Sequence, residues 1–178
     1  FGASTVRENF GSTLFQIDGP VGTSSAATTL MFHGALIHDN DSSGPLASAT
    51  GSGHIVVTGS TLSANRTGPN LFVFDYALSL TASIVFEDAQ RIGNPAEGVY
   101  ARDVLLRDAS GLSPIIGLVL ADPKFVDAAN GNFRLKPDSP ALDRTILLPP
   151  GWPERDNRPR STDLPGIGIP GMPQDLGC

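Results

Sequence analysis

Four carboxylates recur at a matching position in the first part of the chain, and they are the residues with the clearest potential for chemistry. Glu8, Asp39, Glu87 and Asp108 each follow a short apolar run, whereas Ala64 occupies the same position in the run between Asp39 and Glu87. If these runs stack in register, adjacent carboxylates would lie about 5 Å apart and alternate ones about 10 Å apart. Such separations bracket those of the paired acids in retaining and inverting glycosidases.

The same column has a second chemical interpretation as a metal site. Calcium prefers oxygen ligands, so Glu87 and Asp108 are its candidate ligands, and calcium is the one cofactor the sequence suggests. The candidate catalytic residues are Asp39, Glu87, Asp108 and the neighbouring His38. A plainer interpretation competes with the catalytic and the calcium interpretations. In it, the acids are solvated beside a turn and His38 is a surface histidine. Ala64, which interrupts the column, favours it.

A repeated segment of the chain must position these residues. Its copies begin at Leu30, Ile55, Leu78 and Val99, so the spacing shortens from 25 to 23 to 21 residues. Apolar residues alternate within short runs, which is the period of a strand and not of a helix. A repeat of this length built from short strands favours a parallel stack over ankyrin or leucine-rich repeats.

Two positions of the repeat are expected to face inward as columns. A fully buried aliphatic side chain contributes about 1.5–3 kcal/mol, so such columns would form the core. Small residues fill the fifth position in three copies. The third position holds Phe32, Val57, Leu80 and Ala101, the eighth holds Ile37, Leu62, Val85 and Leu106, and the fifth includes Gly34, Gly59 and Ala82.

The eleventh position predicts a polar ladder at one corner of the stack. It holds Asn9, Asn40, Asn65 and Asp88. Asparagine tolerates left-handed backbone geometry at a turn, and stacked side-chain amides can hydrogen-bond along the stack. We therefore expect these four residues to form a structural ladder.

The composition changes near Leu120, and this change divides the chain. Ten of the 15 prolines follow that residue. We predict coils over residues 1–120, starting within a repeat, and an irregular, proline-rich capping segment over residues 121–178. An open strand edge at the end of a stack invites association unless it is covered. The expected lid consists of Phe125, Val126, Phe133 and Leu135, with a hairpin turn at Asn130-Gly131.

Charge and composition exclude several classes of function. The formal charge of −6 argues against nucleic acid as a partner, because phosphate binding needs clustered Lys and Arg. No apolar run approaches the length of a membrane span. A single cysteine, Cys178, excludes an internal disulfide.

Motifs in the last part of the chain resemble a known family. They are Asp122-Pro-Lys-Phe-Val-Asp127, Asn130-Gly-Asn-Phe-Arg-Leu135, Ser139-Pro-Ala-Leu-Asp143, Asp156-Asn-Arg-Pro159 and Asp175-Leu-Gly-Cys178. This pattern is similar to the C-terminal end of right-handed parallel β-helix repeat proteins of the "choice-of-anchor Q" type. The resemblance implies a secreted β-helix protein and carries over no catalytic residues.

Together these observations predict an all-β, right-handed parallel β-helix of about four to five coils with an irregular C-terminal cap. We expect a non-catalytic secreted or cell-surface module for adhesion, glycan contact or scaffolding. Its expected partners are a polysaccharide or cell-surface glycan and upstream coils of the same polypeptide, and its outward aromatic candidates are Tyr76, Tyr100 and Trp152. The alternative is a polysaccharide lyase or glycoside hydrolase that uses the acidic column.

Overall fold

The regular secondary structure of the described residues consists almost entirely of β-strands. The computed structural model describes residues 4–18, 28–87, 91–93, 98–110, 112, 115–148, 171 and 174–177. A short 3-10 helix, η1 (Ala128–Asn130), interrupts the strands. The strands are β1 (Thr5–Arg7), β2 (Phe10–Gly11), β3 (Phe15–Asp18), β4 (Thr29–His33), β5 (Leu36–His38), β6 (Asp41–Ser42), β7 (Ala47–Thr50), β8 (His54–Thr58), β9 (Thr61–Ser63), β10 (Phe72–Phe74), β11 (Ala77–Phe86), β12 (Val99–Leu106), β13 (Ile115–Leu120), β14 (Phe125–Asp127) and β15 (Asn132–Leu135).

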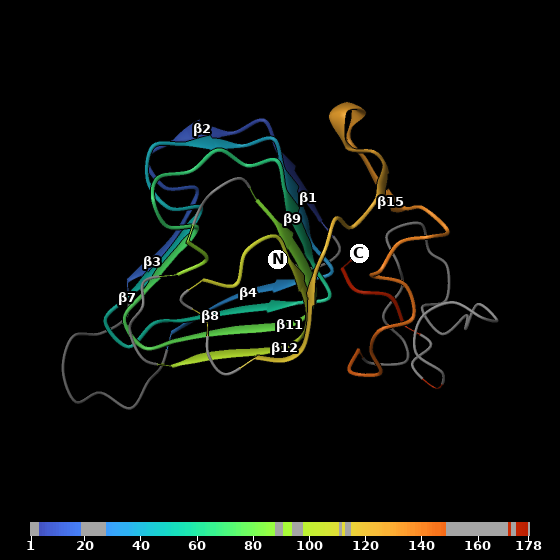
Figure 1. The fold of residues 1–178 in the computed structure, drawn as a ribbon. Coiled ribbons are helices and arrows are strands. Elements are labelled where there is room, and N and C mark those ends of the chain that lie inside the picture. Colours follow the sequence, from blue (N-terminus) through green and yellow to red (C-terminus); the bar gives the residue numbers. More distant parts are fainter. Residues whose placement is uncertain are drawn as a thin grey trace.

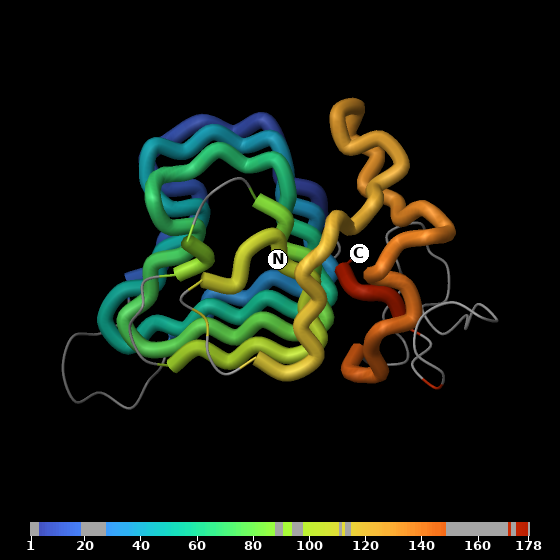
Figure 2. Tube along the Cα trace, in the orientation of Figure 1, coloured from blue at the N-terminus to red at the C-terminus, as the bar shows by residue number. Residues whose placement is uncertain are grey.

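Successive passes of the chain place their strands on one another in parallel. One wall runs through β1, β5, β9, β11, β12 and β13, and a second joins β4 and β8 to the first halves of β11 and β12. A third wall consists of β3, β7 and β10, and β2 pairs with β6 at a further corner. Figures 1 and 2 show these walls around a common interior. The arrangement is all-β, mostly parallel and compatible with a β-helix.

The register of the strands follows the sequence repeat. Leu30 lies opposite Ile55, Ile55 opposite Leu78, and Leu78 opposite Val99, which are the residues that begin successive copies. The next pairing departs from the repeat, because Val104 in β12 lies opposite Leu118 in β13, only 14 residues later. The predicted parallel stacking of the copies is therefore confirmed, and the last pass is much shorter than the others.

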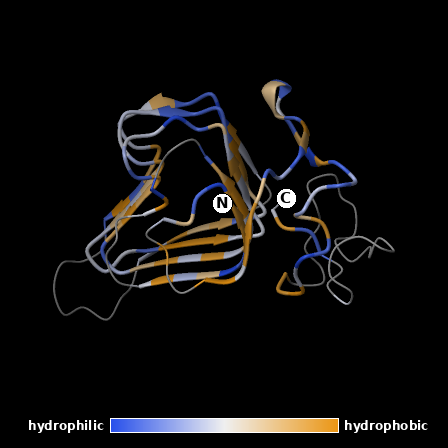
Figure 3. Ribbon diagram, in the orientation of Figure 1, coloured by the Kyte–Doolittle hydropathy of each residue, from blue (hydrophilic) through white to orange (hydrophobic). Residues whose placement is uncertain are grey.

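The two predicted inward columns form the core. All eight side chains at the third and eighth repeat positions are buried, none more than 1% exposed. They belong to one apolar cluster that also contains Phe72 and Phe74 of the third wall. Figure 3 shows the apolar residues concentrated on the stacked strands. Alternation within each strand thus sends every second side chain inward, as the sequence predicts.

The bends between the first and second walls carry a column of residues with left-handed backbone. Gly34, Gly59 and Ala82 have positive φ, and Asp103 and Gly117 extend the column. The residue after each bend adds a polar contact that the sequence did not predict: the Ser60 hydroxyl accepts the Ala35 N–H at 3.1 Å, and the Ser83 hydroxyl accepts the Ser60 N–H at 3.2 Å. Both hydroxyls are buried with their partners, so they satisfy amides that the bends would otherwise leave unpaired.

The segment after Leu120 differs from the expected cap in where it lies. Phe125 and Phe133 are buried and pack edge to face with ring centroids 5.1 Å apart. Their apolar cluster includes outward residues of the first wall, among them Leu36, Ile84 and Leu105. In Figure 1 the segment lies beside that wall. The predicted apolar lid therefore covers the side of the stack, because alternation gives this wall a second apolar face. Phe125, Phe133 and Leu135 belong to it, whereas the prediction for Val126 is wrong, because its side chain is 44% exposed.

The hairpin turn predicted at Asn130-Gly131 is confirmed between β14 and β15, with Gly131 in a left-handed conformation. Near the end of the chain, the Gly177 N–H donates to the Ala82 carbonyl at 2.9 Å. The predictions for Trp152, the Asp156–Pro159 motif, the prolines between 149 and 170 and Cys178 lie outside the described residues. Among the described residues, no helix is long and apolar enough to span a membrane.

Candidate functional site

The predicted acidic column is only partly formed, at the corner that follows the first wall. Arg7, His38 and Ser63 lie in register, so the next residues, Glu8, Asp39 and Ala64, stack at the corner. All three have left-handed backbone, with φ of 56°, 52° and 58°. The exposed Glu8 carboxylate lies 3.3 Å from the Arg7 guanidinium. The column thus contains two acids, each with a local partner, and then an alanine.

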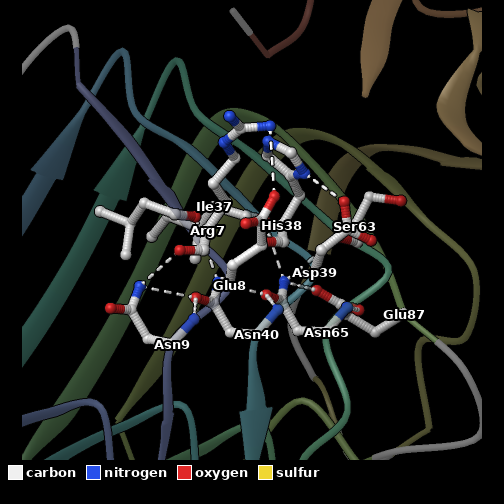
Figure 4. A network of polar contacts seen from close by, with 11 residues as sticks. Arg7, Glu8, Asn9, Ile37, His38, Asp39, Asn40, Ser63, Asn65 and Glu87 are labelled. Carbon is white, nitrogen blue, oxygen red and sulfur yellow. Dashed lines mark hydrogen bonds and ion pairs between the residues drawn. The ribbon is translucent and has the colours of Figure 1, made fainter. Parts of the chain in front are cut away.

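The asparagines at the same corner form a continuous hydrogen-bonded ladder (Figure 4). Asn9 donates its backbone and side-chain N–H to Asn40 Oδ1, at 3.1 and 2.9 Å. Asn40 donates in the same way to Asn65 Oδ1, at 3.2 and 2.7 Å. Each side-chain amide also donates to the carbonyl two residues earlier. The stack of Asn9, Asn40 and Asn65 therefore has the form that the sequence predicts.

Glu87 takes the next place in this ladder. Its Oε1 accepts the Asn65 side-chain N–H at 2.6 Å, and its Oε2 accepts the Asn65 backbone N–H at 2.8 Å. The side chain is buried, and Figure 4 shows it in line with the three asparagines. The sequence placed Glu87 in the acidic column and Asp88 in the ladder; Asp88 itself lies outside the described residues. Glu87 is thus a structural residue of the corner in this arrangement.

His38 is buried, with 2% of its surface exposed, so the expectation of a surface histidine is wrong. Its Nδ1 lies 2.6 Å from Asp39 Oδ2, and its ring lies 4.7 Å from the Phe133 ring of β15. His38 does point outward from the wall, but the tail covers it. His38 and Asp39 therefore form a pair, but Phe133 of the tail covers the His38 ring. A large substrate would have to approach from the side that the tail occupies.

Asp108 lies apart from the other candidates, on the exposed turn after β12. Its Oδ1 accepts hydrogen bonds from the Ser110 hydroxyl at 2.7 Å and from the Ser110 N–H at 2.8 Å. These two bonds lower the pKa of Asp108 below its ordinary value. Within the described residues, no group of three or more His, Cys, Asp or Glu could hold a metal ion. The candidate calcium ligands Glu87 and Asp108 therefore have separate structural partners.

The outer face of the second wall presents aromatic side chains. The rings of His54 and Tyr76 stack with centroids 4.5 Å apart and an interplanar angle of 12°. Tyr76 is 60% exposed, and Tyr100 is 46% exposed, so the prediction that both point outward is confirmed. Met31, Val56, Ser79 and Tyr100 follow one another across β4, β8, β11 and β12. This set, with His54 and Tyr76, is called the aromatic face below.

A cleft of about 460 Å³ lies between the first wall and the tail hairpin. The wall contributes the ends of β9, β11 and β12, and the tail contributes residues on both sides of β14 and β15. Both lysines of the tail and five other charged or aromatic residues meet there. The lining consists of Ser63, Ala64, Phe86, Arg107, Asp122, Lys124, Phe125, Ala128, Lys136 and Asp138.

Several charges in the cleft are already paired. The Lys124 ammonium donates to Asp138 Oδ2 at 2.7 Å, and this hydrogen bond lowers the pKa of the Asp138 carboxyl. Asp122 Oδ1 accepts the Lys124 backbone N–H at 2.8 Å. The Arg107 guanidinium lies 5.3 Å from the centre of the Phe86 ring. Sequence reasoning missed this site, because its residues come from four separate segments that only the docked tail brings together.

Comparison with known proteins gives no match for this chain among protein-family models, curated proteins or solved structures.

Proposed function

We propose that the chain is a non-catalytic module of a right-handed parallel β-helix, secreted or displayed at a cell surface, which contacts glycans. The observation that carries the proposal is the aromatic face on regularly stacked parallel strands. Connections between parallel strands are right-handed in nearly all folds, which supports the handedness. The similarity of the tail motifs to secreted β-helix proteins supports the location.

Glycan contact is supported by the chemistry of the aromatic face. Tyr76 and Tyr100 offer exposed ring surfaces, and the stacking of His54 on Tyr76 holds one of them in place. Tyrosine combines a large apolar area with a polar hydroxyl, which suits ligands with alternating apolar and polar patches. Ser79, beside Tyr100 in the register, and Thr81 further along β11 add hydroxyl groups on the same face.

Upstream coils are the second proposed partner, and the open end of the ladder supports this. Each asparagine oxygen after Asn9 accepts two hydrogen bonds from the preceding pass, whereas no described residue donates to Asn9 Oδ1. Strands β1, β2 and β3 likewise have a described partner on one side only. A further pass with an asparagine at its corner would supply the missing donors and pair these strands.

The proposal of a non-catalytic module is supported by the structural hydrogen bonds that the candidate acids make. Glu87 holds the end of the ladder, Asp39 bonds His38, and Asp108 bonds Ser110. A glycosidase needs two carboxyl groups facing each other across the scissile bond, one of them with a raised pKa. The pKa of Asp108 moves the other way. The lyase or hydrolase alternative would need an acid pair elsewhere.

A binding and turnover assay tests the proposal. The protein is run through gels containing a panel of neutral and acidic polysaccharides, and the same polysaccharides are assayed for released reducing ends and unsaturated products. We expect retardation by at least one polysaccharide and no products. Replacing both Tyr76 and Tyr100 with alanine should weaken the retarding interaction by about tenfold or more.

Phe10→Ala is the matched control, because Phe10 is 80% exposed but lies away from the aromatic face on β2. It should leave the retardation unchanged. Equal retardation of the double tyrosine variant and the unmodified protein would overturn the proposed face. Time-dependent product formation would instead establish the enzymatic alternative.

A further inference from the structure

The cleft between the first wall and the tail hairpin has a positive lining in an acidic protein. The chain carries a formal charge of −6 and has only two lysines, Lys124 and Lys136. Both line this cleft, together with Arg107, against two acids. Of these acids, Asp138 pairs with Lys124 at 2.7 Å. The Lys136 charge also helps to lower the pKa of Asp138, after the Lys124 hydrogen bond, but its ammonium forms no ion pair among the described residues. The cleft therefore offers a cation that can still take an anionic partner.

The cleft offers a reason for the alanine that interrupts the acidic column. Ala64 lines the cleft, and it stacks below Asp39 at the corner position that also holds Glu8. The left-handed backbone at this position accepts an acidic side chain in both of those passes. A carboxylate at position 64 would enter the lining and oppose an incoming anion. The small, uncharged alanine keeps the cleft open and positive.

We propose that this cleft binds the carboxylate of an acidic sugar, a hexuronate, with Lys136 as the cationic partner. A volume of about 460 Å³ lies in the range of small-ligand sites. Phe86 and Phe125 give the lining an apolar part that suits the sugar ring. The cleft follows the C-terminal ends of β11 and β12, whereas the aromatic face lies near their N-terminal ends. The site is therefore separate from the aromatic face and does not depend on it.

Titration with glucuronate, followed by two-dimensional NMR of the labelled protein, tests the inference. We expect saturable shifts of amides in the lining, with little response to glucose, which lacks the carboxylate. Ala64→Asp should raise the Kd about tenfold, because it places a negative charge in the cleft. Ala64→Asn has nearly the same shape without the charge, and should change the Kd by less than about threefold.

Two further variants separate binding from folding and from the aromatic face. Lys136→Gln should weaken glucuronate binding about tenfold while the melting temperature stays within about 2 °C, because the side chain is exposed. Tyr100→Ala should leave glucuronate binding unchanged, so that failure of the aromatic face and failure of the cleft are distinguishable. Equal effects of Ala64→Asp and Ala64→Asn, equal binding of glucose, or displacement by an equal concentration of acetate would each overturn the inference.

Discussion

At the scale of the residue, the buried side chain of Glu87 ends the asparagine ladder at the corner. Asparagine can both donate and accept, so a column of asparagines extends from pass to pass. An ionised glutamate only accepts, and the two oxygens of Glu87 accept the backbone N–H and a side-chain N–H of Asn65. The ladder therefore has a direction. At one end no described residue donates to Asn9 Oδ1, and at the other end the Glu87 carboxylate accepts from Asn65.

Asn65→Ala tests the ladder at a buried position. The change removes the acceptor of two Asn40 donors and one of the two donors to Glu87. Leaving buried polar groups unpaired should lower the free energy of unfolding by about 2–4 kcal/mol, measured by urea denaturation. Asn9→Ala is the control at the exposed end and should cost less than about 1 kcal/mol. Equal costs at the two positions would contradict the ladder as the main role of Asn65.

The inward columns and the asparagine corner were predictable because each depends on spacing within the repeat. The sequence placed Glu87 at the position of Ala64, but it did not predict that the side chain of Glu87 joins the ladder. Phe86 lies opposite Ser63, so Glu87 follows in the place of Ala64, and its longer side chain reaches Asn65. The serines at positions 60 and 83 were visible in the sequence, but serine is too common in turns to indicate buried hydrogen bonds.

At the scale of the element, the tail changes the environment of the first wall. Its strands present apolar side chains on both faces, with Ile37 inward and Leu36 outward under the tail. The sequence predicted an apolar lid, but a list of apolar residues does not specify which surface they cover. Burial of His38 under Phe133 and formation of the charged cleft both follow from this lateral position.

Phe133→Ala tests the docking of the tail. Phe133 is 4% exposed and contacts both Phe125 and His38, so its truncation should cost about 3–5 kcal/mol. We expect faster hydrogen exchange over residues 123–148 than in the unmodified protein. Val126→Ala lies on the same hairpin at a 44% exposed position, and should cost within about 0.5 kcal/mol. Unchanged exchange in the Phe133 variant would place the tail's main attachment elsewhere.

At the scale of the whole molecule, the register between passes places both proposed contact regions. The same β11 and β12 that carry the aromatic face at one end border the cleft at the other. A slip of one residue would turn the inward columns outward and move Tyr100 to the interior face. The central claim is therefore that the passes stack in parallel with the register Val56 opposite Ser79.

Disulfide trapping measures that register most directly. In a Cys178→Ser background, Val56→Cys with Ser79→Cys places two outward cysteines on paired positions, about 4.8 Å apart between Cα atoms. This distance permits a disulfide, whereas Val56→Cys with Thr81→Cys shifts one partner by two residues, to about 8 Å, which does not. We predict rapid intramolecular oxidation of the first pair only, detected by mass spectrometry of proteolytic fragments. Preferential oxidation of the second pair, or equal rates for both, would contradict the stacked register.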